Sequence, residues 1–398
     1  METIKGVKYV SVVRCEDYGR SQVYEAVKQS IELLGGLGQF VSPGQKVFVK
    51  FNMLQGSAPE TCIATHPDVV YAAARLLKEH GCSVVMGDSP GSGLPYTEAV
   101  LRKGYAVSGY QAVSDELGIP LNYDTGYEGV MAPNGRMMKR FSVIKPALEA
   151  DAIVNVSKAK THSLTNLSGA AKNMFGVIPG LEKPVYHANF QSADDFSRAI
   201  IDLNEVVMPK LQIMDAIMGM EGDGPHGGTP RKIGAVLASG DYSAIDVATA
   251  RLMALDLKRI PTLSAAIERG YLKEDYSDVA VVGDALESLV VKDYKCPAAF
   301  VGPAVDAAHR NGLTRMASMV KEMALKPRII KGKCVSCMKC MRSCPVKAIT
   351  VVDKKPSIDY SKCIRCYCCH EMCDDHAIAL ERSLKGKIMM AVMTLRAR

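Results

Sequence analysis

The stretch CVSCMKCMRSCP (residues 334–345) decides the fold of the C-terminal part of the chain, and CIRCYCCHEMCD (residues 363–374) repeats its spacing. In each stretch, three cysteines are spaced three residues apart and a fourth follows four residues later. Three thiolates at this spacing can surround one [4Fe–4S] cube from a single tight loop, whereas the fourth lies too far round to close the same cube. We therefore expect the fourth cysteine of each stretch to bind the cluster of the other stretch.

This spacing predicts two [4Fe–4S] clusters, the first held by Cys334, Cys337, Cys340 and Cys373, and the second by Cys363, Cys366, Cys369 and Cys344. The two stretches also repeat as a unit, because the pair Ala348-Ile349 recurs 29 residues later as Ala377-Ile378. Such a repeat is typical of a pseudo-symmetric bicluster ferredoxin domain. Two details depart from the pattern: Asp374 stands where the first stretch has a proline, and Cys368 is a spare thiol that leaves the register of the second cluster open.

Structural zinc sites and disulfides are the alternatives for these cysteines. Zinc ribbons use two separated CxxC pairs for each metal, not four cysteines within eleven residues. Disulfides are rare in reducing compartments, and the charged N-terminus shows no signal-peptide pattern. No apolar stretch is long enough for a membrane span. We therefore predict a cytoplasmic protein without a transmembrane segment.

The composition is that of an ordinary globular protein. The chain has 398 residues, of which 48% are hydrophobic and 23% charged, which leaves room for two or three domains. Charge is uneven, because residues 326–398 carry 16 basic against 6 acidic side chains, an excess of ten. Part of that excess compensates anionic clusters, and the rest is suited to an acidic redox partner protein. Nucleic-acid binding is not expected, since the basic residues are not interleaved with aromatic ones.

The first three hundred residues alternate short apolar runs with helical patterns, which predicts an α/β domain with a mostly parallel sheet, followed by a small α+β bicluster ferredoxin-like domain. The expected helices cover residues 22–34, 67–80 and 242–255. The expected strands cover residues 7–13, 46–50, 83–87, 152–156, 211–215, 235–238 and 279–282.

Polar residues follow several of these strands, at the edge of the sheet where α/β proteins bind ligands. We expect exposed loops there to form one site for an anionic small molecule, with lysines supplying charge and glycine-rich turns supplying N–H groups. The candidates for acid–base chemistry are Lys160, His162, Lys172 and Asp88, and those for substrate binding are Lys50, Asn52, Asn173, Asp215 and Glu221. Each also has a structural interpretation, as a helix cap, a turn or a counter-charge.

At these positions the large domain resembles the family called domain of unknown function 362, a family of uncharacterised iron–sulfur centre proteins. Together with the ferredoxin module, the resemblance covers nearly the whole chain. It rests on the motifs Lys50-x-Asn52, Thr65-His66-Pro67, Gly87-Asp88-Ser89-Pro90-Gly91, Lys160-Thr161-His162, Gly169-Ala170-x-Lys172-Asn173-x-Phe175-Gly176, Asp215-x-Ile217-x-x-Met220-Glu221-Gly222-x-Gly224-Pro225 and Asp246. The resemblance implies that these loops occur together in members of the family, and it assigns no reaction to them.

The predicted organisation is an α/β domain (1–303), a helical connector (304–326), a 2[4Fe–4S] ferredoxin domain (327–381) and a basic tail (382–398). Three functions are compatible with it. The chain could carry electrons through both clusters to a partner or to a site in the α/β domain. It could be an iron–sulfur oxidoreductase that reduces an anionic small molecule in that domain. It could also be a non-redox sensor or structural protein, although a sensor needs only one cluster.

Overall fold

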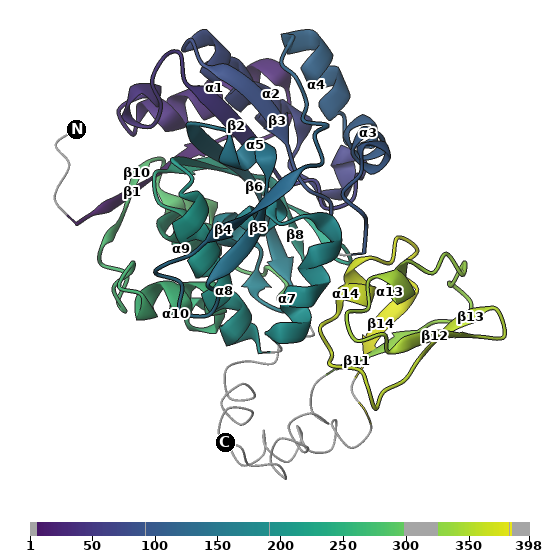
Figure 1. Cartoon of the computed structure of the whole chain (residues 1–398). Helices are drawn as coiled ribbons and strands as arrows, with labels where there is room; N and C mark the ends of the chain where they lie inside the picture. Colours follow the sequence, from purple (N-terminus) through teal and green to yellow (C-terminus); the bar gives the residue numbers. More distant parts are fainter. Residues whose placement is uncertain (1–5, 92, 191, 298–324, 382, 384–398) are drawn as a thin grey trace, which may run out of the picture.

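The computed structural model describes residues 6–91, 93–190, 192–297, 325–381 and 383. Figure 1 shows a large α/β domain and a small C-terminal domain that lies beside one end of it, next to α7 (Lys183–Asn189). The predicted helical connector (304–326) and basic tail (382–398) lie almost entirely outside the described residues.

A mixed and mostly parallel sheet forms the centre of the large domain, in the order β10-β1-β9-β8-β6-β2-β3, with the short β7 paired to β6. Only β9 runs antiparallel to both of its neighbours in this order. The fold class predicted from the sequence is therefore confirmed, and each expected strand overlaps one of the strands β1 (Lys8–Arg14), β2 (Lys46–Phe51), β3 (Ser83–Gly87), β6 (Ala152–His162), β8 (Leu211–Glu221), β9 (Thr229–Ser239) and β10 (Val279–Gly283).

Helices cover both faces of this sheet because its strands are apolar on both sides. In β2, Val47 and Val49 pack with one set of helices, whereas Phe48 between them packs with the other. The first set is α1 (Arg20–Glu32), α2 (Pro67–Glu79), α3 (Glu98–Val107) and α4 (Tyr110–Leu117). The second is α6 (Gly169–Asn173), α8 (Ala193–Val207), α9 (Tyr242–Leu252) and α10 (Pro261–Glu268).

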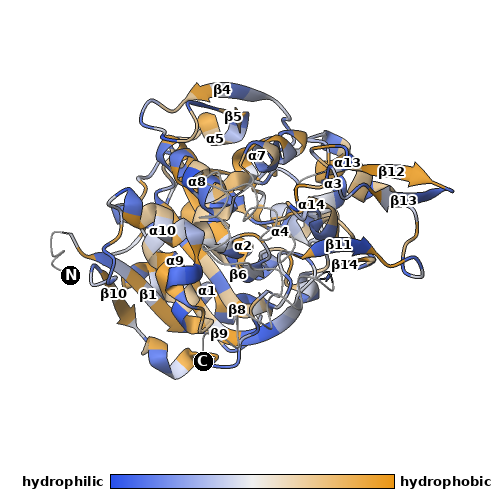
Figure 2. Ribbon diagram, turned by 90° about the horizontal axis from the view of Figure 1, so that it is seen from below, coloured by the Kyte–Doolittle hydropathy of each residue, from blue (hydrophilic) through white to orange (hydrophobic). Residues whose placement is uncertain are grey.

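The shorter elements complete the large domain. A ribbon of β4 (Tyr127–Met131) and β5 (Arg140–Ile144) leads into α5 (Lys145–Leu148), and β7 (Asn166–Leu167) follows β6. The 3₁₀ turns are η1 (Leu37–Gln39), η2 (Pro59–Thr61), η3 (Met174–Val177), η4 (Gly180–Glu182), η5 (Leu257–Arg259) and η6 (Leu286–Leu289). Hydropathy along the ribbon shows the apolar residues gathered in the sheet and on the inner faces of the helices (Figure 2). None of the helices in the described ranges is long and apolar enough to cross a bilayer.

Strands β6 and β8 extend six residues beyond their predicted ends, because they continue to pair with each other and with neighbouring strands. The pairing of β6 with β8 passes through an irregularity between Lys158 and Lys160. Residues 157–162 were expected in a loop and instead belong to a completely buried strand. The expectation that the candidate residues sit on exposed loops is therefore wrong here.

The small domain has an internal two-fold repeat at the spacing of its cysteine stretches. Each element of the first half recurs 29 residues later: β11 (Lys326–Ile329) as β13 (Lys355–Ile358), α13 (Lys339–Arg342) as α14 (Cys368–Glu371), and β12 (Ile349–Val352) as β14 (Ile378–Glu381). The strands pair antiparallel as β11 with β14 and β12 with β13. This is the ferredoxin-like α+β arrangement that the sequence predicted.

Asp246 connects helix α9 to the start of helix α6. Its carboxylate accepts hydrogen bonds from the backbone N–H groups of Ala170 and Ala171. Gly169, at φ 61°, lets the chain pass so close that a Cβ there would collide with this carboxylate. Burial raises the pKa of Asp246 from its ordinary 3.8 to about 7, and the two N–H bonds offset only part of this effect.

We expect Asp246→Asn to reduce the dependence of stability on pH. Because folding raises the pKa of Asp246, its contribution to stability is complete below about pH 4 and disappears as the pH rises through 7. Between pH 4 and pH 8 the free energy of unfolding of the wild type should fall by roughly 4 kcal/mol more than that of the variant. Denaturant titrations followed by circular dichroism measure this difference. Asp115→Asn, at an exposed position of α4, is the control, and equal slopes in wild type and Asp246→Asn would contradict the assignment.

Candidate active site

A cavity at the carboxyl ends of the parallel strands is the main candidate site, and we call it the lysine pocket. Its volume is about 60 Å³. Both domains contribute to its lining, which consists of Lys50, Asn52, Leu54, Asp88, Ser89, Gly91, Lys158, Lys160, Ser168, Gly169, Lys172, Asn173, Phe175, Gly176, Lys183, His187, Pro225 and Glu371.

A buried ion pair between Lys50 and Asp88 forms one side of the pocket. The Lys50 Nζ atom lies 2.8 Å from Asp88 Oδ1, and both side chains are almost completely buried. Lys50 also donates to the Phe51 carbonyl and to Asn173 Oδ1, while Asp88 Oδ2 accepts from the Met53 N–H. Burial lowers the pKa of Lys50, and Asp88 opposes that shift. The pair thus connects the ends of β2 and β3 with helix α6.

Lys160 and Lys183 are buried ammonium groups held by neutral oxygens. Lys160 donates to Asn52 Oδ1 at 2.8 Å and to the Ile63 carbonyl at 2.7 Å. Lys183 donates to carbonyl and hydroxyl oxygens of residues 89–90. Burial is the main reason that the pKa of each lysine falls to about 7. Both groups therefore change charge near neutral pH, where an acid–base catalyst is most effective.

Lys172 differs from the other lysines because, among the described residues, its ammonium group has no hydrogen-bond or ion-pair partner. Its Nζ atom lies 5.8 Å from the ring centres of Phe175 and Phe196. Burial lowers its pKa, while the charge of Glu371 raises it. An ammonium group in this position has all three N–H donors available for a bound ligand.

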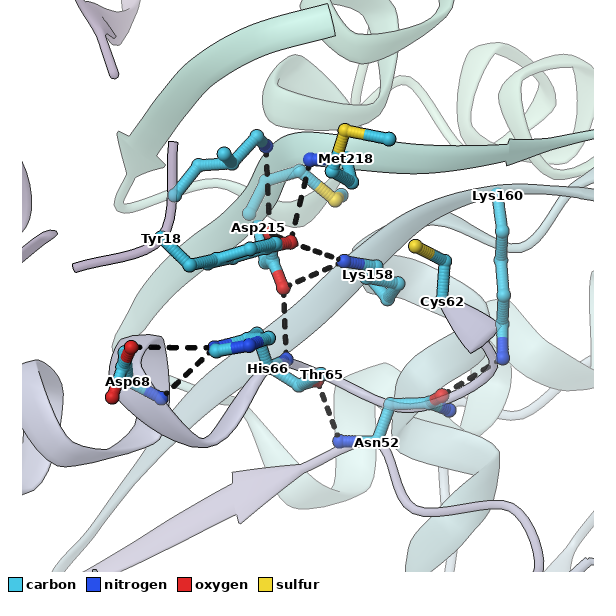
Figure 3. Close-up of polar contacts among 12 residues, drawn as sticks. Tyr18, Asn52, Cys62, Thr65, His66, Asp68, Lys158, Lys160, Asp215 and Met218 are labelled. Atoms are coloured by element: carbon cyan, nitrogen blue, oxygen red, sulfur yellow. Dashed lines mark hydrogen bonds and ion pairs between the residues drawn. The ribbon is translucent and has the colours of Figure 1, made fainter. Parts of the chain in front are cut away.

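Lys158, which also lines the pocket, belongs to a second polar network with Tyr18, His66 and Asp215 (Figure 3). Its Nζ atom donates to Asp215 at 2.9 Å and to the Tyr18 hydroxyl at 2.7 Å. The Tyr18 hydroxyl in turn donates to Asp215, and the Tyr18 ring stacks on His66 at 3.6 Å between centres. Asp215 also accepts from the His66 backbone N–H, so it serves as the counter-charge of Lys158.

Glu371 of the small domain closes the lysine pocket and lies opposite His162 of β6. His162 Nδ1 accepts hydrogen bonds from the N–H groups of Leu164 and Thr165, so in the neutral ring the proton is on Nε2. This Nε2 atom lies 3.6 Å from Glu371 Oε1. Burial keeps the pKa of His162 well below its usual range and raises that of Glu371. The contact therefore directs a neutral imidazole N–H across the junction between the domains.

Two other contacts hold the domains together near this point. Gln55 Nε2 donates to Asp374 Oδ1 at 2.6 Å, and the rings of His226 and His376 stack 5.2 Å apart. Asp374, the residue that replaces the proline of the first cysteine stretch, thus has a role at the domain junction. Lys339 also pairs with it from within the small domain.

Two small cavities in the small domain are each lined by four cysteines. The first is lined by Cys334, Cys337, Cys340 and Cys373, and the second by Cys344, Cys363, Cys366 and Cys369. Both sets combine three cysteines of one stretch with the fourth cysteine of the other. Cys368 is buried but does not line the second cavity. All-thiolate donor sets around apolar cavities are suited to iron–sulfur clusters.

The backbone around the two cavities also fits cluster binding. Ser336 and Met338 in the first loop adopt positive φ angles, as do their counterparts Arg365 and Tyr367 in the second. Such turns point successive N–H groups toward one centre. In addition, the Ala348 and Ala377 N–H groups donate to the sulfur atoms of Cys344 and Cys373, both at 3.2 Å. N–H···S bonds of this kind stabilise anionic clusters and raise their potentials.

Six of the nine residues predicted for the large domain line the lysine pocket, namely Lys50, Asn52, Asp88, Lys160, Lys172 and Asn173. The other three do not. His162 lies behind Glu371, and Asp215 pairs with Lys158. Glu221 pairs with Lys295 and accepts its backbone N–H, away from the pocket. The pocket is also much more buried than the expected loop site.

Sequence reasoning missed Lys183, His187 and Glu371. Lys183 and His187 lie on α7, which follows no strand, so the rule of polar residues at strand ends could not find them. One signal in the sequence could have revealed Glu371. It is an acidic residue within a cysteine stretch, where a cluster already brings negative charge.

We expect Gly176→Ala to disturb the pocket from its backbone side. A Cβ at this position would overlap both Lys50 Nζ and Asp88 Oδ1, which are held in place by other bonds. The overcrowding should cost about 1–3 kcal/mol of stability, measured by denaturant unfolding. Gly38→Ala is the matched control, because its Cβ would meet nothing within 4 Å. Equal stability of the two variants would show that the Lys50–Asp88 pair is less rigid than described.

Comparisons with known proteins agree with this division of the chain. The family model of the domain of unknown function DUF362 matches residues 47–251, and that of a 4Fe-4S dicluster domain matches residues 326–374. The thylakoid-associated protein sll1697 of Synechocystis sp. is 33% identical over 293 residues, which cover 73% of this chain and 88% of that protein. The structure of the lactate racemase apoprotein from Thermoanaerobacterium thermosaccharolyticum aligns with a TM-score of 0.39 and 15% identity, over 63% of this chain and 57% of that one. The chain therefore belongs to the DUF362 family and carries a C-terminal 4Fe-4S iron–sulfur domain.

Proposed function

We propose that this chain is an iron–sulfur oxidoreductase that transfers electrons to an anionic small molecule bound in the lysine pocket. The observation that supports this most directly is the position of helix α14. Its last residue, Glu371, forms part of the pocket wall. Cys369 and Cys373, on either side of Glu371, line different cysteine cavities. The electron-transfer domain thus contributes directly to the site where a ligand would bind.

We further propose that each cysteine cavity holds one [4Fe–4S] cluster, with the ligand sets that line it. When bound, such clusters accept and donate single electrons. The protein contributes the thiolates, the N–H···S bonds of Ala348 and Ala377, and an apolar lining. Cys368 is then a neighbour of the second cluster and not one of its ligands.

The large domain would bind the ligand and supply protons. We assign ligand binding to Lys172, because its donors are otherwise unused, and proton donation to Lys160, whose pKa of about 7 lets it change charge during turnover. The Lys50–Asp88 pair keeps the pocket in shape. His162 is a positioning residue, because it contacts Glu371 and not the pocket itself. Both domains line the pocket, so a bound ligand would displace its water, which strengthens each electrostatic contact with the ligand.

A second candidate function is that of an electron carrier for another protein, in a cytoplasmic location. It is favoured by Val335, which lines the first cysteine cavity although the residue is 64% exposed. This places the cavity close to the surface. Residues 326–398 carry an excess of ten basic side chains, so the partner we propose is an acidic redox protein. In the oxidoreductase, the same surface is where electrons would enter.

The cluster assignment predicts about eight iron and eight sulfide per chain after anaerobic reconstitution. Cys334→Ser and Cys363→Ser should each lose about half of the iron, because each removes a ligand of a different cluster. Cys368→Ser should keep nearly all of it, as should Cys296→Ser, the control outside both cavities. Iron and acid-labile sulfide analysis gives the answer. Zinc without sulfide would refute the assignment, and loss of half the iron in Cys368→Ser would show that the register of the second cluster is wrong.

The oxidoreductase proposal predicts that oxidation through the pocket depends on Lys172. Protein reduced with dithionite and freed of excess reductant is mixed with 2-oxo acids, unsaturated carboxylates, nitrite and sulfite, and cluster absorbance is followed. At least one of these should oxidise the wild type more than about 10-fold faster than Lys172→Met, since one charge-assisted hydrogen bond contributes at least that factor. Ferricyanide, which needs no pocket, should oxidise both equally. If every oxidant oxidises the wild type and Lys172→Met at equal rates, the electron-carrier function explains the protein better than the oxidoreductase function.

A further inference from the structure

When its lysines are all protonated, the lysine pocket has two positive charges without a counter-charge. Five lysines line it, namely Lys50, Lys158, Lys160, Lys172 and Lys183. Asp88 neutralises Lys50, Asp215 neutralises Lys158, and Glu371, counted as ionised, offsets a third. Buried charges are expensive unless they are paired, so an excess of two predicts a ligand that brings the missing negative charge.

The hydrogen-bond donors of these lysines show which of them remain for a ligand. An ammonium group has three donors. Lys50 and Lys183 each make three contacts with protein oxygens, so they contribute only their charge. Lys158 and Lys160 each make two, which leaves one N–H apiece, and Lys172 keeps all three. The Nζ atom of Lys158 lies between Tyr18 and Asp215, so the donors that remain for a ligand are those of Lys160 in β6 and Lys172 in α6.

The size of the pocket limits the ligand. A buried water needs about 10–15 Å³ by the same measure of cavity volume, so a cavity of about 60 Å³ holds roughly four to six waters. That space suits a tetrahedral oxyanion or a short-chain dicarboxylate. A nucleotide is several times larger than the pocket.

We propose that the natural ligand of the lysine pocket is a small dianion, either a phosphate-type oxyanion or a short dicarboxylate, bound by Lys160 and Lys172. This deepens the proposed function and rests on it, because it names the class of molecule that the oxidoreductase would act on. Lys50 and Lys183 also line the pocket and add charge to it.

Binding of a dianion should also take up protons. Lys160 faces Lys50, Lys158, Lys172, Asp88 and Glu371, and Lys183 faces the same Lys50, Lys172 and Asp88. With pKa values of about 7, both lysines are mostly neutral at pH 8 in the free protein, and a nearby dianion raises both pKa values. Affinity should therefore fall as the pH rises from 6 to 9, with proton uptake at pH 8 and little at pH 6.

Isothermal titration calorimetry on the oxidised, reconstituted protein tests the proposal without any electron transfer. The probes are sulfate and succinate as dianions and acetate and nitrate as monoanions, at constant ionic strength. At least one dianion should bind roughly 10- to 100-fold more tightly than either monoanion, the factor expected for one additional charge-assisted hydrogen bond. Sulfate against succinate distinguishes an oxyanion site from a dicarboxylate site. Titrations in Tris and HEPES at pH 8 measure the proton uptake.

Lys172→Met should weaken binding of the dianion by a similar factor, whereas Lys103→Met, at an exposed position of α3, should leave it unchanged. Lys172→Met should unfold at no lower temperature than the wild type, because it removes an unpaired charge, so loss of fold would not explain a loss of binding.

Equal affinity for monoanions and dianions, or dianion binding that does not depend on Lys172, would overturn the proposal. Dianion binding without oxidation by any anion would leave it standing and refute only the oxidoreductase. Oxidation through the pocket by a monoanion, with no preference for dianions in the binding titrations, would support the oxidoreductase and refute the dianion proposal.

Discussion

The buried ion pair between Lys50 and Asp88 is the contact on which the rest of the site depends. It lies where two neighbouring parallel strands end, and its hydrogen bonds extend to Met53, Phe51 and Asn173. Removing one member of such a pair leaves an unpaired buried charge, which typically costs 3–5 kcal/mol. Because the pair satisfies itself, it is available as a rigid wall and not as a ligand group. Lys160, Lys172 and Lys183, which form no ion pair with a described carboxylate, give the pocket its chemical character.

Much of this arrangement could be predicted from the sequence, for reasons that are local. Buried parallel strands such as residues 46–50 are short β-branched runs, and cysteine spacing limits which thiolates can reach one cluster. The ends of β6 and β8 could not be predicted in the same way. Residues 157–162 are polar, and only pairing with β8 and burial by neighbouring elements make them a strand. Tertiary contacts therefore override the local pattern where the chemistry is concentrated.

The residues that the sequence did not reveal are those placed by contacts between distant parts of the chain. Lys183 reaches the pocket from a short helix that no strand-end rule covers, and Glu371 arrives from a separate domain. Conversely, Asp215 and Glu221 lie within β8, at and beyond its predicted end, but each is occupied by a lysine partner. A position at a strand end predicts where a polar residue lies. Whether it remains free to bind a ligand depends on its neighbours in space.

The double role of helix α14 couples the integrity of the iron–sulfur domain to the shape of the lysine pocket. The segment that presents Glu371 to the pocket is held between two cysteines that line separate cavities. Loss of the iron–sulfur centres would release this segment, so the pocket would lose one of its walls although every residue of the large domain is intact.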